Sequence, residues 1–283
     1  MISHGMARPP KTSAIDQRPV AQRQGRREFA AAVAGASPSS QVLPYTHVTD
    51  GYAFRDVLQS GELRPTPCRV FGTDLLYMFY GRPAYRAAQE DESSGIDAYW
   101  PVCFVLKAEG IKPTRVFPFD SGAFQSGRYA DHMYHRMIKE DFEVDPDPTS
   151  PPRLINLFWR DGRSYYDADS RRGLKDPSAD AMDFELRAYR DLIASTGRAP
   201  FDERNSSVEA QFDGPIRLKD NTVAVILPSE FASPSVMKRI DDLGAISLPF
   251  STVQRQGPGN MVAQIYDVVR DLLSGIHGGI ACW

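Results

Sequence analysis

The apolar residues of this 283-residue chain occur in short runs, which glycine, proline and charged residues separate. The longest runs, such as residues 223–228, fall far short of the roughly 20 apolar residues that a membrane-spanning helix needs. Runs of this length that are rich in aromatic and β-branched residues are typical of strands. We therefore expect a protein that folds around a sheet and does not enter a membrane.

Composition excludes several other classes of protein. Hydrophobic residues make up 42% of the chain and charged residues 24%, which is ordinary for a globular protein and excludes collagen, wholesale disorder and coiled coil. The three cysteines, Cys68, Cys103 and Cys282, form no Cys-x-x-Cys pair and are too few for a disulfide framework. This cysteine usage predicts a cytoplasmic protein.

Charge is distributed unevenly along the chain. Residues 1–40 hold six lysines and arginines against two acidic residues, a net charge of +4, so the remainder carries −7 of the total −3. Few large apolar residues in this part could repay the entropy lost on ordering. We expect residues 1–41 to form a disordered basic tail, with at most a short helix at 26–33. A single folded domain is expected over residues 42–283, with an insertion around 120–205.

Local patterns indicate more strands than long helices. A helix should begin at Thr49 or Asp50 and end at Gly61, since these residue types favour helix starts and left-handed helix ends. Another should carry Met182 and Ile193 on one face. Strands are expected at residues 45–48, 75–80, 98–107, 114–119, 207–212, 222–227 and 245–248, and further helices at 234–243 and from residue 260. The fold class predicted is α+β, a mostly antiparallel mixed sheet with helical decorations.

Several familiar catalytic motifs are missing from the sequence. The chain has no Gly-x-Gly-x-x-Gly after a strand, no Walker loop, no His-Glu-x-x-His and no Gly-x-Ser-x-Gly. Rossmann dehydrogenases, P-loop nucleotidases, zincin proteases and α/β-hydrolases are therefore not the first hypotheses.

Three segments carry unusual residues in strand context. The first is YTHVT at 45–49, directly before an amphipathic helix that ends in LQSGEL; the second is LYMFYGRPAY at 76–85; the third is SSVEAQF at 206–212. In the third segment Val208, Ala210 and Phe212 alternate, so a strand leaves Glu209 and Gln211 together on the opposite face.

The order of these motifs resembles the ADP-ribosyltransferase fold, and most closely its DarT-type branch. That branch has a "YHIT" strand before a helix with a Ser-Gly end, then an aromatic segment with Arg and Pro, and then a strand with the catalytic glutamate. The resemblance covers three short motifs within residues 45–227. It implies a fold of the ADP-ribosyltransferase type, with NAD as substrate and Glu209 as the catalytic carboxylate.

The chemistry of such a site assigns a role to each candidate. Cleavage of the nicotinamide–ribose bond passes through an oxocarbenium-like state, which the Glu209 carboxylate would stabilise. The remaining candidates are Arg82 as a second catalytic group on a pyrophosphate or acceptor, His47 and Thr49 on a ribose, and Tyr77 and Tyr80 stacked on nicotinamide. No metal is expected.

Every candidate also has a purely structural explanation. Glu209 could point outward from its strand, and His47 could be a structural histidine. Tyr77 and Tyr80 could belong to the core, while Arg82 before Pro83 could anchor a turn. A shaped loop at 117–124 (FPFDSGAF) could lie beside a site or be a packed turn.

The function expected is NAD-dependent ADP-ribosyl transfer to a macromolecule, with hydrolysis of NAD as a side reaction. The alternative is a non-catalytic nucleotide- or protein-binding module on the same scaffold. A third hypothesis is a metal-dependent nuclease that uses His132 and His135. The resemblance points to a nucleobase in DNA as acceptor, whereas the −7 charge of the folded part favours a protein or small molecule.

Overall fold

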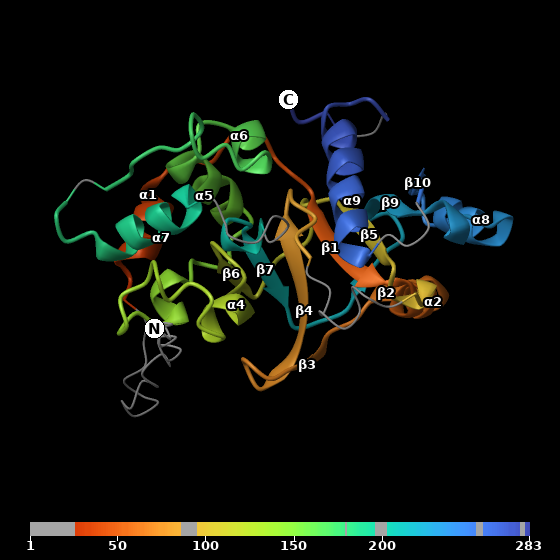
Figure 1. The fold of residues 1–283 in the computed structure, drawn as a ribbon, viewed down its shortest axis with the longest axis horizontal. Helices are drawn as coiled ribbons and strands as arrows, with labels where there is room; N and C mark the ends of the chain where they lie inside the picture. The colour runs from red at the N-terminus through yellow and green to blue at the C-terminus, as the bar shows by residue number, and fades with distance from the viewer. Residues whose placement is uncertain (1–25, 86–94, 179, 196–202, 253–256, 278–280) are drawn as a thin grey trace, which may run out of the picture.

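The computed structural model describes residues 26–85, 95–178, 180–195, 203–252, 257–277 and 281–283. It is an α+β fold with a mostly antiparallel mixed sheet, as the sequence predicts (Figure 1). The strand order is β10-β9-β5-β1-β4-β7-β6. Every neighbouring pair in this order is antiparallel except β9 and β10, which are parallel.

The strands of this sheet are β1 (Tyr45–Asp50), β4 (Thr73–Tyr80), β5 (Pro101–Leu106), β6 (Arg115–Phe117), β7 (Glu209–Phe212), β9 (Thr222–Pro228) and β10 (Ile246–Phe250). Strand β3 (Thr66–Cys68) pairs with β4, and β2 (Glu62–Leu63) forms a separate ladder with β8 (Ile216–Arg217). All six residues of β5 are buried, because helices cover both faces of the sheet there. Pro101 is the first residue of β5, a position that does not interrupt the ladder.

Helix α2 (Gly51–Ser60) forms for the reasons that the sequence indicates. The Asp50 carboxylate accepts a hydrogen bond from the Ala53 amide at 2.8 Å, and Gly61 ends the helix with a φ of +69°. The Phe54 ring of α2 packs against Phe104 of β5, with ring centroids 5.8 Å apart. This contact covers one face of the sheet.

A cluster of helices lies beside β6 and β7 (Figure 1, left). Its members are α1 (Glu28–Gly35), α4 (Ser121–Gln125), the 3-10 helix η3 (Lys139–Phe142), α5 (Ser150–Phe158), α6 (Gly162–Tyr166), α7 (Phe184–Ala194) and the 3-10 helix η4 (Glu203–Asn205). All except α1 belong to the expected insertion at 120–205. Helix α1 packs against α5, α7 and η3.

The other end of the sheet carries α8 (Pro234–Asp242), α9 (Pro258–Leu273), and the 3-10 helices η2 (Asp97–Tyr99) and η5 (Ser229–Phe231). The buried face of α9 contacts Cys103 and Val105 of β5 and Ala224 and Ile226 of β9. Of the helices in the described parts of the chain, none combines the length and the apolar character that crossing a membrane requires.

Two expectations differ from the structure. Residues 28–35 form α1, which overlaps the short helix expected at 26–33, but its Phe29 and Val33 side chains are buried in the main core, so ordered structure begins before residue 42. Phe29 and Val33 give α1 an apolar face, which α5, α7 and η3 cover. Met182 precedes α7 and is 69% exposed, so it is not part of that helix's buried face. The expected helix end at Gly197 lies outside the described residues.

Candidate active site

A cavity of about 290 Å³ brings together residues that are far apart in the sequence. It is lined by Thr46, His47, Val48, Tyr77, Phe79, Ala84, Tyr85, Asp120, Gly122, Arg204 and Glu209. Three of the six expected site residues are among them: His47 from β1, Tyr77 from β4 and Glu209 from β7. The cavity has the modest size and mixed aromatic and polar walls of a small-molecule site.

Glu209 accepts hydrogen bonds from three groups at the cavity wall. Its side chain is only 1% exposed. The Ser121 hydroxyl donates to Oε1 at 2.7 Å and the Ser121 amide donates to Oε2 at 3.1 Å. The Gln211 amide nitrogen donates to Oε1 at 2.7 Å and also to the Ser121 hydroxyl at 3.1 Å. These bonds fix the position of a buried carboxylate that faces a cavity.

The pKa of Glu209 is raised above its ordinary value of 4.5. Burial is the main cause, and the negative charge of Asp120 adds to it, while the hydrogen bonds from Gln211 and Ser121 oppose it. Asp120 itself forms an ion pair with Arg204, with Oδ2 and Nη1 2.7 Å apart. Two carboxylates and one guanidinium therefore share the cavity. A carboxylate in a cavity with a raised pKa, as Glu209 is, is typical of functional sites.

His47 lies where β1 and β4 separate. Their pairing ends at Thr46 and Phe79, and the His47 Nδ1 atom is 2.8 Å from the Tyr77 carbonyl oxygen. A carbonyl only accepts hydrogen bonds, so Nδ1 carries the proton. Burial lowers the pKa of His47, which keeps the ring neutral. Nε2 is therefore a hydrogen-bond acceptor, suited to a ligand hydroxyl.

Tyr77 and Phe79 line the cavity from alternate positions of β4. The Tyr77 hydroxyl lies 2.7 Å from the Cys68 sulfur atom of β3. The pKa of Tyr77 is raised, mainly by burial, so its hydroxyl stays protonated. Aromatic rings beside two carboxylates form a wall that favours a planar, positively charged ligand.

Arg82 and Tyr80 lie outside the described cavity lining. The Arg82 side chain is fully buried, and its guanidinium donates to the Tyr166 carbonyl at 3.2 Å and to the Ser206 hydroxyl at 2.7 Å. Tyr80 is 1% exposed, and its hydroxyl accepts from the Leu43 amide. Both residues join the sheet to neighbouring segments. This position matches the structural explanations given above, an anchored turn and a core tyrosine.

Thr49 is half-buried on β1, beyond His47, and does not line the cavity. Strand β1 continues past the cavity toward Asp50, and Thr49 pairs there with Val102 of β5. Thr49 therefore does not line the cavity together with His47, with which the sequence grouped it.

Four site residues were not identified as such from the sequence. Asp120 and Ser121 belong to the FPFDSG segment, whose order of residues did indicate a shaped loop. Gln211 shares the face of Glu209 on β7, and the alternation around it was the only signal. Arg204 had no signal, because its role depends on a contact with a residue 84 positions away.

The two histidines at 132 and 135 lie in turns and not on one helix. Across the described ranges, no group of three or more His, Cys, Asp or Glu side chains is arranged to hold a metal ion. The nuclease hypothesis therefore gains no supporting site from these residues.

No protein-family model, no curated protein and no solved structure matches this chain.

Proposed function

We propose that this protein is an ADP-ribosyltransferase that takes NAD as its substrate, on an α+β fold of that superfamily's type. The observation that carries the proposal is the buried Glu209 carboxylate, which faces one cavity together with His47 and the ring of Tyr77. A cavity with this combination suits a ribose that is attached to a planar cation.

In the reaction proposed, the bond between the anomeric carbon of the ribose and the nicotinamide nitrogen breaks. Its electron pair leaves with the nitrogen, so the pyridinium becomes neutral nicotinamide. The positive charge that develops on the ribose is stabilised by the ionised Glu209. An acceptor nucleophile then bonds to the anomeric carbon and loses its proton; with water as acceptor, the product is free ADP-ribose.

The neighbouring residues supply position and shape. His47 Nε2 accepts a hydrogen bond from a ribose hydroxyl. Tyr77 and Phe79 flank the nicotinamide ring, in place of the expected pair Tyr77 and Tyr80. We assign Arg82 to the support of the β4 end, through its bonds to Tyr166 and Ser206.

Release of nicotinamide from NAD by the purified protein tests the proposal. Glu209→Gln should lower the rate by at least about 100-fold, because it removes charge stabilisation of the transition state. Glu143→Gln is the matched control, since the pKa of Glu143 is also raised by burial but it does not line the cavity. An unchanged rate in Glu209→Gln would refute the assignment. A rise in melting temperature with NAD, without any release, would favour the non-catalytic binding module.

The acceptor is identified by a separate experiment. The protein is incubated with labelled NAD and with separate pools of DNA, RNA and protein from a cell extract. The net negative charge of residues 41–283 favours label in protein over label in DNA. Label in DNA that falls steeply as salt rises would reverse this preference, and label in none of the pools would leave hydrolysis as the activity.

A further inference from the structure

The turn before α4 connects Glu209 to an ion pair between Asp120 and Arg204. The Asp120 carboxylate meets Arg204 Nη1 at 2.7 Å, and both side chains are mostly buried, 13% and 16% exposed. The Asp120 amide also donates to the Arg204 carbonyl at 3.0 Å. Arg204 and Asp120 are thus joined through both backbone and side chain.

The same turn places Ser121 within hydrogen-bond distance of the Glu209 carboxylate. Asp120 Oδ1 accepts from the Ala123 amide at 2.8 Å and so begins α4. The next residue, Ser121, donates its amide and its hydroxyl to the two oxygens of Glu209. Upstream, the Pro118 carbonyl accepts from the Tyr189 hydroxyl at 3.0 Å. A displacement of Asp120 would therefore move both donors away from Glu209.

Charge balance in the cavity depends on the same pair. The titratable groups that line the cavity with Glu209 are His47 from β1, Tyr77 from β4, Tyr85, Asp120 from the turn and Arg204 from η4. Two of these groups carry no charge. His47 is neutral because burial lowers its pKa, and Tyr77 is neutral because burial raises its pKa. Asp120 and Arg204 thus supply the full charges near Glu209 among the described lining residues.

We propose that Asp120 and Arg204 are positioning residues for Glu209. Their ion pair fixes the turn that holds Ser121 against the carboxylate, and Arg204 compensates the second negative charge in the cavity. This inference deepens the proposed function and rests on it. It assigns Arg204 the task of limiting how far the charge of Asp120 disfavours ionisation of Glu209, because the chemistry needs the ionised form.

Removal of a negative neighbour and removal of a positive neighbour should shift the pKa of Glu209 in opposite directions. Asp120→Asn removes the negative neighbour and keeps an oxygen that can cap α4, so the pKa of Glu209 should fall. Arg204→Gln leaves Asp120 uncompensated, so the two carboxylates should hold a proton to higher pH. We expect shifts of about one pH unit in each direction. Arg204→Lys keeps the charge and should restore most of the parent's titration.

Two measurements follow these variants. The first is the pH profile of nicotinamide release. Its acid limb should shift to lower pH in Asp120→Asn and to higher pH in Arg204→Gln. At neutral pH the second variant should lose up to about tenfold in kcat, with less change in the KM for NAD. The second measurement is the titration of the Glu209 carboxyl carbon by NMR in glutamate-labelled protein, assigned by its loss in Glu209→Gln. Melting curves confirm that each variant is folded.

The NMR titration separates failure of this inference from failure of the proposed function. Opposite shifts of the Glu209 titration support compensation of the Asp120 charge by Arg204, whether or not nicotinamide is released. If the parent releases none, the function is wrong and the compensating role of Arg204 stands. Unchanged titrations, or shifts in the same direction in both variants, overturn the compensating role even if the protein cleaves NAD.

Discussion

The two ends of the molecule have cores of different kinds. Around α1, α5 and α7 the core is aromatic, and its rings contact each other edge-to-face or stacked; its members include Phe29, Phe119, Phe142, Phe158 and Tyr189. Between α9 and strands β5 and β9 the core is mostly aliphatic, with Val105, Ile226, Ile265, Val269 and Leu272. The candidate active site draws on the turn that the aromatic end holds.

The difference shows how the molecule divides its tasks. The aliphatic core is built from side chains of β5, β9 and α9, and it stabilises the sheet. The aromatic core is built from segments between residues 28 and 194, and its Tyr189 hydroxyl holds the Pro118 carbonyl. Phe119, next to the functional Asp120, is itself a member of this core. Packing at the aromatic end therefore determines where Asp120 and Ser121 lie.

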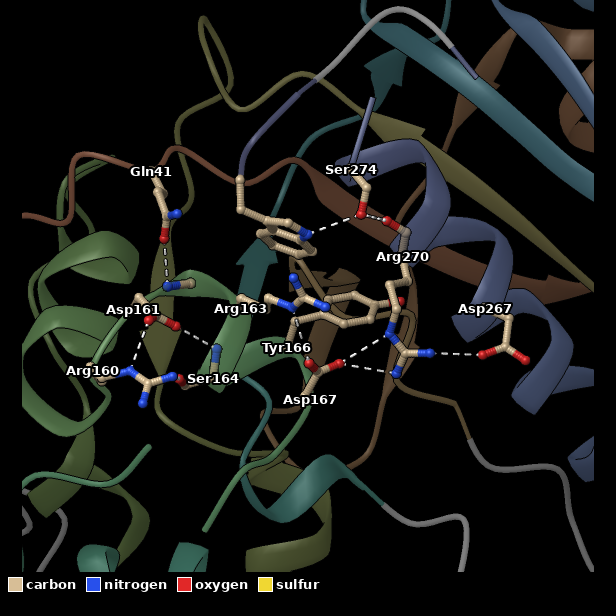
Figure 2. Close-up of polar contacts among 12 residues, drawn as sticks. Gln41, Arg160, Asp161, Arg163, Ser164, Tyr166, Asp167, Asp267, Arg270 and Ser274 are labelled. Carbon is tan, nitrogen blue, oxygen red and sulfur yellow. Dashed lines mark hydrogen bonds and ion pairs between the residues drawn. The ribbon is translucent and has the colours of Figure 1, made fainter. Parts of the chain in front are cut away.

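Polar contacts between α6 and α9 connect the two ends (Figure 2). Asp167, which follows α6, forms an ion pair with Arg270 of α9 at 3.0 Å. The Tyr166 hydroxyl donates to the Tyr266 carbonyl at 2.6 Å. The Tyr166 backbone carbonyl is also the acceptor for Arg82. These contacts join the two ends of the molecule, and Arg82, which they reach through Tyr166, follows the end of β4.

The largest effect should come from the aromatic end. Phe158→Ala removes a ring that stacks on Phe29 and meets Tyr189 edge-on at 4.7 Å. We expect a loss of about 4 kcal/mol in the free energy of unfolding, measured by urea denaturation. Nicotinamide release per folded molecule should also fall, because Tyr189 holds the turn before α4. Phe158→Leu, which refills part of the space, should recover part of both losses.

Leu272→Ala tests the aliphatic end in the same way. Leu272 is fully buried between α9 and the sheet. The expected loss is about 3 kcal/mol in the free energy of unfolding. Release of nicotinamide per folded molecule should stay near that of the parent, since α9 supplies no described residue of the cavity. A drop in activity as large as that of Phe158→Ala would contradict the division of tasks.

The pH dependence of stability should show the cost of the buried Glu209. The pKa of Glu209 is raised, so the folded protein holds this proton more tightly than the unfolded chain does. The contribution of Glu209 to stability therefore falls as pH rises from 4.5 through the raised pKa. The free energy of unfolding of Glu209→Gln, relative to that of the parent, should rise by more than about 1 kcal/mol between pH 4 and high pH. Thermal denaturation at a series of pH values measures this difference. A pH-independent difference would mean that Glu209 is not perturbed by burial.

The smallest effect should come from the contact between the two ends. Asp167 and Arg270 are 33% and 39% exposed, so water screens their attraction. We expect Asp167→Asn to lower the free energy of unfolding by less than about 1 kcal/mol. A double-mutant cycle with Arg270→Gln isolates the ion pair from other contacts of either residue. A coupling energy of several kcal/mol would show that this ion pair stabilises the protein far more than its exposure suggests.

Local patterns in the sequence determined most of the secondary structure. The start of α2 at Asp50 and its end at Gly61 depend only on nearby backbone groups, and the alternation around Glu209 placed that residue on one face of a strand. Helix α1 shows the limit of local patterns. A short helix was expected at 26–33, but its residues were grouped with a polar tail, and contacts with α5 and α7 show that its apolar face is buried.

The candidate site divides along the same line. Alternation within β4 and β7 could predict that Tyr77 and Glu209 lie on faces opposite their core-facing neighbours, because a strand repeats every two residues. Tertiary structure alone decided that Arg82 bonds to Tyr166 and Ser206 outside the cavity lining, and that Asp120 meets Arg204 beside Glu209. The physical reason is the range of the forces: strand and helix patterns arise from neighbours along the chain. Charge compensation in a buried cavity depends on which distant segments the packing of the aromatic core brings together.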